Sequence, residues 1–285
     1  MIFGSEFSAE TDKTALITGG TSGIGAEFAK EYAKKGYNLI ITGRRVEVLE
    51  KVAQNISDTY RKKVEMIVIE LSDKIQLEAF VSTLLVRTDI EVLVNAAGFG
   101  VNSLFAEANP DLVEKMIIVH DLVPLRLIRA VLPSILANDT GTIINVASDG
   151  AYLLLPRNAV YASSKAFLKT FSETLHLELK DTNLQVQVLC PGLTKTDFHE
   201  KMGMTKKRQK NHGMVKWSMP DEIVRASFDA LRKHRVICIP KKSIRMLIAC
   251  TERMPRNLFY AFMSSLGNRM FPKKKIQTQG VQKRI

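Results

Sequence analysis

The sequence predicts an α/β fold in which about seven parallel strands form a doubly wound sheet with helices on both faces. Three observations support this prediction. Short runs of valine, isoleucine and leucine alternate with amphipathic stretches of helical period. Most of these runs are continuously apolar, as expected of strands that are covered on both faces. A basic region with apolar residues at helical spacing follows the last run.

Strands and helices are expected in strict alternation over residues 13–240. The expected strands are Ala15–Thr18, Asn38–Thr42, Val64–Ile69, Val92–Val94, Thr142–Val146, Val186–Leu189 and Val236–Ile239. The expected helices are Ile24–Lys35, Val46–Tyr60, Lys74–Val86, Leu112–Ala137, Ala159–Leu179 and Asp221–Lys233. Such alternation is typical of βαβ units with right-handed crossovers. Residues 241–285 are expected to add a basic tail of one or two amphipathic helices.

Composition indicates a folded, globular chain. The 285 residues are 46% hydrophobic, and no window reaches the roughly 18 consecutive apolar residues of a membrane span. Residues 1–12 lack the basic start and long apolar run of a signal peptide. They include Gly4-Ser5-Glu6-Phe7, which resembles a cloning-site remnant. We expect residues 1–12 to be tag-derived or disordered.

The three cysteines are Cys190, Cys238 and Cys250. They are too scattered to form a disulfide framework or a metal site, and buried inert thiols explain them best. We therefore expect a cytoplasmic protein without a bound metal.

The net charge of +12 is concentrated in the last third of the chain. Residues 1–200 contain 20 basic and 25 acidic residues, whereas residues 201–285 contain 21 and 4. This excess favours an anionic partner, but a solvated basic face explains it equally well. For the tail, a peripheral membrane contact, an oligomer contact and a cover for a substrate pocket remain open. No recognition motif supports nucleic-acid binding, so we expect none.

A glycine-rich turn joins the first expected strand to the first expected helix. It reads Thr18-Gly19-Gly20-Thr21-Ser22-Gly23-Ile24-Gly25. Glycines in this context let the backbone approach a pyrophosphate, and the helix N-terminus offers free N–H groups to that anion. We therefore predict a Rossmann-type dinucleotide site rather than a simple turn.

The end of the second expected strand indicates which dinucleotide is bound. A carboxylate usually stands there in sites for NAD, where it binds the ribose 2′-hydroxyl. This chain has Gly43 instead, followed by Arg44 and Arg45. An arginine can pair with a 2′-phosphate in bidentate geometry. We therefore predict NADP(H) as the cofactor, with Arg44 on the phosphate.

Three residues further along the chain are suited to proton chemistry. Tyr161 and Lys165 are four apart on an expected helix, so they share one face, and an ammonium group can lower the pKa of a nearby phenol. A hydroxyl such as that of Ser148 could stabilise charge on the same substrate oxygen. The Tyr–Lys spacing alone is common, and a half-buried tyrosine beside a surface lysine would explain it.

In combination, these motifs resemble those of the classical short-chain dehydrogenase/reductases. The matching segments are TGGTSGIG at 18–25, NAAG at 95–98, Ser148 thirteen residues before Tyr161, and YASSK at 161–165. The segment Pro191-Gly192-Leu193-Thr194-Lys195-Thr196 matches the family's loop on the nicotinamide side. The resemblance covers residues 13–240.

The resemblance implies a hydride transfer between nicotinamide and a carbonyl or secondary alcohol, in a homo-dimer or homo-tetramer. It implies that Ser148 positions the carbonyl, that Tyr161 transfers the proton, and that Lys165 binds the nicotinamide ribose and tunes Tyr161. With Arg44, Tyr161 and Lys165, the implied cofactor contacts are Gly19, Thr21, Ser22, Gly23, Ile24, Gly25, Glu70, Leu71, Asn95, Ala97, Pro191, Gly192, Thr194 and Thr196.

One position departs from the family pattern. The family usually has an asparagine four residues before the position of Pro124, where it helps to hold a water that links the lysine to solvent. This chain has His120 there, which we include among the candidate catalytic residues. Histidine can also bond a water and titrates near neutral pH. A helix histidine without a role, in a slightly shifted alignment, is the alternative.

Residues 194–217 are expected to form a lid over the substrate. The apolar residues of this lid are Phe198, Met202, Met204, Met214 and Trp217. They favour a partly apolar substrate, such as an acyl, steroid-like or aliphatic compound, although core packing explains them nearly as well. The alternative function is a dinucleotide-binding, membrane-peripheral interaction module with little activity. The intact Ser148, Tyr161 and Lys165 favour an enzyme.

Overall fold

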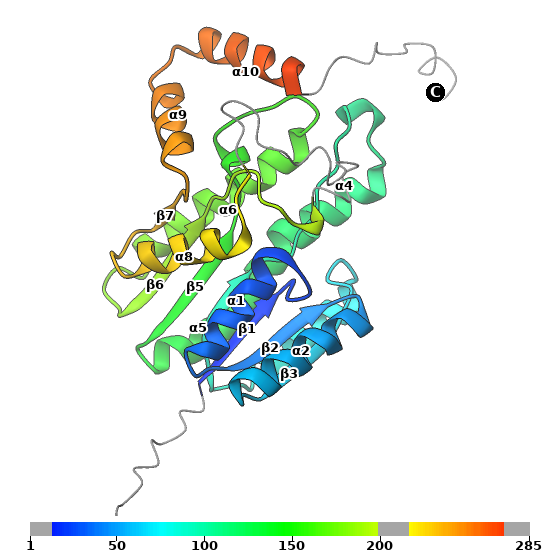
Figure 1. Ribbon diagram of the computed structural model, residues 1–285, viewed down its shortest axis with the longest axis vertical. Coiled ribbons are helices and arrows are strands. Elements are labelled where there is room, and N and C mark those ends of the chain that lie inside the picture. Colours follow the sequence, from blue (N-terminus) through cyan, green and yellow to red (C-terminus); the bar gives the residue numbers. More distant parts are fainter. Residues whose placement is uncertain (1–12, 199–216, 271–285) are drawn as a thin grey trace, which may run out of the picture.

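The computed structural model describes residues 13–198 and 217–270, which form a three-layered α/β fold (Figure 1). The strands are β1 Thr14–Thr18, β2 Asn38–Gly43, β3 Val64–Val68, β4 Ile90–Asn95, β5 Gly141–Val146, β6 Leu184–Leu189 and β7 Ile237–Cys238. They form one sheet in the order β3-β2-β1-β4-β5-β6-β7, and every neighbouring pair is parallel. The predicted doubly wound sheet of about seven strands is therefore confirmed.

Helices cover both faces of this sheet. The helices of one face are α1 Gly23–Lys34, α2 Val46–Tyr60 and α8 Pro220–Leu231. Those of the other face are α3 Lys74–Leu84, α5 Val123–Ala137 and α6 Ala159–Glu178. Helix α4 (Pro110–Ile117) leads into α5. Helices α9 (Lys242–Glu252) and α10 (Arg256–Met270) form the basic C-terminal region and lie at the end of the molecule opposite α2 and β3 (Figure 1).

The central strands divide their side chains between two apolar cores. In β1, Leu16 packs into the core beneath α3 and α5, whereas Ala15 and Ile17 pack into the core beneath α1 and α2. Successive side chains of a strand point to opposite faces, so a strand covered on both sides has to be apolar throughout. This is why the continuous apolar runs identify the strands.

The helix expected at Leu112–Ala137 is interrupted in the structure. Helix α4 passes through a π-helical turn at Ile118–Leu122 before α5 begins. Pro124 lies just after this turn and has no N–H to give to the carbonyl of the preceding turn, so the regular α-helical ladder is broken there. The π-turn carries His120 and Asp121.

The strands β1, β4, β5 and β6 end at the same edge of the sheet. In a parallel sheet, the segments that follow these carboxyl ends meet above the edge and provide the usual place for a ligand. The glycine-rich turn, the NAAG segment, Ser148 and Pro191 each follow one of these strands.

Candidate functional site

A cavity of about 1240 Å³ lies at the carboxyl ends of the strands. Its walls are formed by the segments after β1, β2, β4, β5 and β6, and by residues of α6, α9 and α10. All of the predicted site residues line it except Asn95 and His120. The structure therefore gathers residues from across the chain into one continuous site.

The start of α1 is open to an anion. Gly19 and Gly23 have φ values of +71° and +60°, in the left-handed region that favours glycine. A Cβ on Gly23 would lie 2.8 Å from Cγ2 of Thr196, so the turn packs closely against the segment after β6. Among the described residues, no side chain caps the first turn of α1, and that turn has no acidic residue. Its N–H groups fit a pyrophosphate.

A buried polar network stiffens the sheet behind this turn. The hydroxyl of Thr18 accepts the N–H groups of Ala96 and Ala97 at 3.0 and 3.1 Å. Asn95 Nδ2 donates to Asn145 Oδ1 of the neighbouring strand at 2.8 Å. Thr18 and Asn145 were missed by the sequence reasoning, although a polar residue at the end of an apolar strand is a usable signal.

The end of β2 is crowded at position 43 by the side chains of Thr21 and Leu49. A Cβ on Gly43 would lie 2.4 Å from Cγ2 of Thr21 and 3.3 Å from Leu49. The carboxylate that binds a ribose 2′-hydroxyl at this position in NAD sites therefore cannot be accommodated here without a shift of Thr21.

Two arginines at this end of the cavity are paired with carboxylates. Arg44 Nη1 lies 3.0 Å from Glu70 Oε2, and Arg45 Nη2 lies 3.2 Å from Asp197 Oδ2. Partial burial acts to raise the pKa of Glu70, but hydrogen bonds from Ser72 and Arg44 outweigh it and lower that pKa. Both arginine side chains remain exposed at the cavity, at 59% and 42%. Arg45 and Asp197 were not among the predicted site residues.

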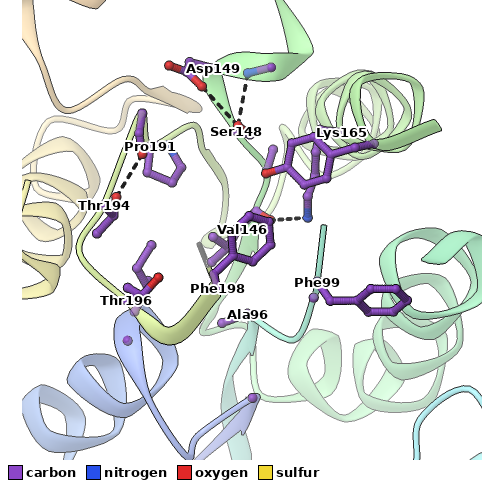
Figure 2. Close-up of a pocket in the computed structure, with 18 of the residues that line it drawn as sticks. Ala96, Phe99, Val146, Ser148, Asp149, Lys165, Pro191, Thr194, Thr196 and Phe198 are labelled. Carbon is purple, nitrogen blue, oxygen red and sulfur yellow. Dashed lines mark hydrogen bonds between the residues drawn. The ribbon is translucent and has the colours of Figure 1, made fainter. Parts of the chain in front are cut away.

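Ser148, Tyr161 and Lys165 meet at the centre of the cavity. Ser148 Oγ accepts the N–H of Gly150 at 3.0 Å and donates to Asp149 Oδ1 at 3.1 Å (Figure 2). Lys165 Nζ donates to the carbonyl of Val146 at 3.0 Å, so the ammonium group is anchored to the end of β5 (Figure 2).

Burial controls the ionisation of this centre. It raises the pKa of Tyr161 well above its ordinary value of 10 and lowers the pKa of Lys165 to about 8. The sequence led us to expect that Lys165 lowers the pKa of Tyr161, and this is not what the structure shows. Lys165 Nζ is 5.9 Å from the Tyr161 ring centroid and is directed at Val146, so the loss of solvent has the larger effect.

His120 lies behind the cavity wall with both ring nitrogens engaged. Nε2 accepts the N–H of Phe99 at 3.1 Å, so the proton of the neutral ring is assigned to Nδ1, which lies 2.9 Å from Ser164 Oγ. Burial, and then the charge of Lys165, lower the pKa of His120 well below 6.5. The neutral ring ties the segment after β4 to α6. A water relay through His120 would require one of these bonds to break.

The C-terminal helices complete the far end of the cavity. Ile244, Leu247 and Leu266 line it, together with Leu153 and Leu155 from the segment after β5. Beneath them, a buried apolar cluster fixes α9 and α10 to the rest of the fold; its core consists of Leu153, Ile248, Phe259 and Met263. The tail therefore covers part of the pocket, which was one of the three roles left open by the sequence.

The expected lid is described only at its two ends. Phe198 lines the cavity, with its ring 5.8 Å from that of Tyr161, whereas Trp217 is buried with 8% of its surface exposed. Thr194 pairs with Ser218 in an isolated parallel bridge, so the two ends lie side by side. Met202, Met204 and Met214 lie outside the described residues.

Comparison with known proteins agrees with this geometry. The family model described as short chain dehydrogenase matches residues 13–207. An uncharacterized oxidoreductase of Staphylococcus saprophyticus is 31% identical over 82% of this chain and 97% of that protein. The very-long-chain 3-oxoacyl-CoA reductase of Mus musculus is 33% identical over 192 residues, which are 64% of this chain and 59% of that protein.

Solved structures give the same result. A short-chain dehydrogenase from Sphingobium yanoikuyae in complex with NADPH has a TM-score of 0.75 and 25% identity, over 94% of this chain and 98% of that one. An alcohol dehydrogenase from Thermococcus sibiricus complexed with 5-hydroxy-NADP has a TM-score of 0.68 and 27% identity, over 80% of this chain and 95% of that one. The chain therefore belongs to the short-chain dehydrogenase/reductase family of oxidoreductases, which act on alcohols and carbonyls.

Proposed function

We propose that this protein is an NADP(H)-dependent oxidoreductase that interconverts a carbonyl group and a secondary alcohol in a partly apolar substrate. The observation that carries the proposal is that one cavity contains both the uncapped N-terminus of α1, which can bind an anion, and the side chains of Ser148, Tyr161 and Lys165. A module that only bound dinucleotides would have no need of all three side chains at the cavity centre, so the interaction-module alternative is not favoured.

Each side chain at the centre has a task in this proposal. Tyr161 gives its hydroxyl proton to the substrate oxygen during reduction and takes it back during oxidation. Ser148 donates a hydrogen bond to the same oxygen and stabilises its developing charge. Lys165, anchored to the Val146 carbonyl, would hold the nicotinamide ribose. The bound nicotinamide supplies or accepts the hydride.

The remaining cofactor contacts are divided between two ends of the cavity. The turn Gly19–Gly25 would hold the pyrophosphate, Glu70 and Leu71 would border the adenine, and Thr196 would border the carboxamide, since all of them line the cavity. Asn95 acts from behind the wall through its bond to Asn145. We assign His120 the task of fixing the segment after β4, because both of its ring nitrogens already have partners.

Arg44 is expected to give the preference for NADP(H). The carboxylate of an NAD site fits at position 43 only if Thr21 shifts, and the Arg44 guanidinium is exposed at the cavity. Arg44→Ala should weaken NADPH binding by about 1.5–3 kcal/mol, the value of a hydrogen bond to a charged group, and should barely change NADH binding. Fluorescence titration of both cofactors measures this.

Arg45→Ala and Arg61→Ala are the comparisons for this experiment. Arg45 stands beside Arg44 and shares the cavity, whereas Arg61 lies at the far end of α2 and should have no effect. If Arg45→Ala lost more NADPH affinity than Arg44→Ala, the binding of the 2′-phosphate would be assigned to Arg45 instead of Arg44. Equal use of NADH and NADPH by the unaltered protein would contradict the proposed specificity.

The apolar end of the cavity indicates the class of substrate. Leu153, Leu155, Ile244, Leu247 and Leu266 provide a surface for an acyl, steroid-like or aliphatic group next to the reacting carbonyl. The similarity to a very-long-chain 3-oxoacyl-CoA reductase supports an acyl group among these choices. Consumption of NADPH with 2-octanone, acetophenone, a 3-ketosteroid and a 3-oxoacyl thioester tests the proposal. No consumption with any of them would count against it.

We further propose a peripheral membrane contact through α9 and α10. Within residues 13–198 and 217–270, no helix is both long and apolar enough to cross a bilayer. Exposed apolar residues of α10 include Leu258 and Phe262, at 60% and 37% exposure. The exposed charged residues of the two helices and of the turn between them are Lys242, Arg245, Glu252, Arg253, Arg256 and Arg269. Exposed apolar side chains together with an excess of cations are suited to an anionic lipid surface.

Flotation with liposomes that contain phosphatidylserine tests this contact. The double variant Leu258→Glu, Phe262→Glu should reduce the bound fraction at least several-fold, because it removes apolar area and adds negative charge. The matched control is the double variant Ile75→Glu, Val86→Glu, since these residues are 82% and 80% exposed and lie in or just after α3 rather than in α9 or α10. An equal loss in both variants, or no binding by the unaltered protein, would overturn the proposal. The homo-dimer or homo-tetramer and the cytoplasmic location stay predictions.

A further inference from the structure

Asp149, next to Ser148, has no task in the reaction proposed above. It begins a short 3-10 turn at Asp149–Ala151 and lines the cavity beside Ser148 (Figure 2). Its Oδ1 accepts the Ser148 hydroxyl proton at 3.1 Å. A Cβ on Gly192 would lie only 3.0 Å from Oδ2, so the carboxyl group fills the space between Ser148 and the segment after β6.

The Ser148 hydroxyl has a single proton, for which several oxygens compete. One lone pair of Oγ is already occupied by the N–H of Gly150 at 3.0 Å. Ser148 also acts to lower the pKa of the Tyr161 phenol against the larger effect of burial, so the two hydroxyl groups lie near each other. While the proton is directed at Asp149, it is not available to a substrate oxygen. A carboxylate attracts this proton more strongly than a neutral carbonyl does, because hydrogen bonds to ionised acceptors are roughly twice as strong.

We propose that Asp149 is a positioning residue whose ionised carboxylate withholds the Ser148 proton from the substrate, and whose protonation releases it. The inference rests on the proposed function, since it requires a substrate oxygen that Ser148 can stabilise. A neutral Asp149 can donate its own O–H to Ser148 Oγ, and Ser148 can then donate to the substrate. Ketone reduction is therefore faster when Asp149 is protonated.

The groups around Asp149 place its protonation within the pH range in which enzyme activity can be measured. Burial raises the pKa of Asp149 to about 6, against the opposing effect of the hydrogen bond from Ser148. The titratable groups that face it are Tyr161 from α6, Cys190 after β6 and Lys241 before α9. Burial raises the pKa values of Tyr161 and Cys190, so both are neutral near pH 6. Lys241 is the cation that favours the carboxylate.

The test compares Asp149→Asn with the unaltered protein in NADPH-dependent reduction between pH 5 and 8. The ketone is the one that the unaltered protein reduces fastest. The ratio of kcat/KM, variant over unaltered, should be close to 1 at pH 5 and rise to about fivefold at pH 7.5, with its midpoint near pH 6. The gain should appear mainly in kcat, because Ser148 stabilises charge that develops during the reaction. Taking the ratio cancels the titration of Lys165.

Lys241→Gln and Asp58→Asn serve as the comparison variants. Removal of the Lys241 charge should move the midpoint to higher pH, whereas Asp58, exposed near the end of α2, should leave the profile unchanged. A ratio that stays constant with pH, above or below 1, would overturn the inference, because a merely structural role gives a constant factor. If no ketone is reduced by the unaltered protein, the proposed function itself fails and the inference fails with it.

Melting temperature without cofactor gives a readout that does not depend on activity. The pKa of Asp149 is higher in the folded chain than the ordinary value, so folded stability falls as pH rises from about 4 to about 6. Asp149→Asn lacks this loss. Its melting temperature should therefore increase relative to the unaltered protein between pH 4 and 7, and a constant difference would overturn the inference.

Discussion

Tyr161→Phe should reduce carbonyl reduction by about 10³-fold, within the usual range for the loss of a general acid. The variant keeps the ring and loses only the hydroxyl. Its neighbours His120 and Phe198, with ring centroids at 5.7 and 5.8 Å, can retain their packing. Steady-state NADPH consumption with an accepted ketone measures the rate, and fluorescence titration should show an NADPH affinity within about twofold of normal.

Tyr152→Phe is the matched control for this prediction. Tyr152 also follows β5, and its ring lies 5.1 Å from Lys169 Nζ, so the same change is made in a similar environment. It should leave the rate nearly unchanged. If Tyr161→Phe kept the normal rate, another group would have to supply the proton, and the proposed assignment would be wrong.

Lys165→Met should abolish most activity and yet make the protein more stable at pH 7. Lys165 is only 5% exposed, and burial lowers its pKa to about 8, from about 10.5. This difference in pKa means that burial of the charged lysine lowers the free energy of unfolding by about 3 kcal/mol. Loss of the charged hydrogen bond to the Val146 carbonyl costs the variant about 2 kcal/mol, so a net gain of about 1 kcal/mol is expected.

The pH dependence of this gain gives the decisive measurement. The folded chain binds the Lys165 proton less tightly than the unfolded chain, so the cost is complete below pH 8 and disappears as pH rises from about 8 to about 10.5. Urea denaturation at pH 7 and pH 10 should therefore show a stabilised variant at pH 7 and a much smaller difference at pH 10. Lower stability of Lys165→Met at pH 7 would contradict the expected cost of the buried charge.

Several elements could be predicted from sequence because their signal is local. Strands covered on both faces are continuously apolar, and the glycine-rich turn stands between one of them and a helix. Ser148, Tyr161 and Lys165 were found by their spacing. In each case the pattern lies within a few residues of the feature it predicts.

The features that were missed depend on contacts between distant segments. The partnership of Thr18 with the NAAG segment spans 78 residues, and the pair Arg45–Asp197 spans 152. The engagement of His120 with Phe99 and Ser164 could not be read from its position in a helix. The pKa of Tyr161 was expected to fall because only the charge of Lys165 is visible in sequence, whereas burial is set by the packed fold.

The bridge between Thr194 and Ser218 has a consequence for how the sequence of this chain can vary in evolution. Because the two ends of the intervening segment are already held together by main-chain bonds of Lys195 and Ser218, its length and composition can vary at little entropic cost to the sheet. Exchange of residues 199–216 for the corresponding residues of a relative, with Thr196 and Asp197 retained, should therefore change substrate preference and leave the cofactor contacts and the proton chemistry in place.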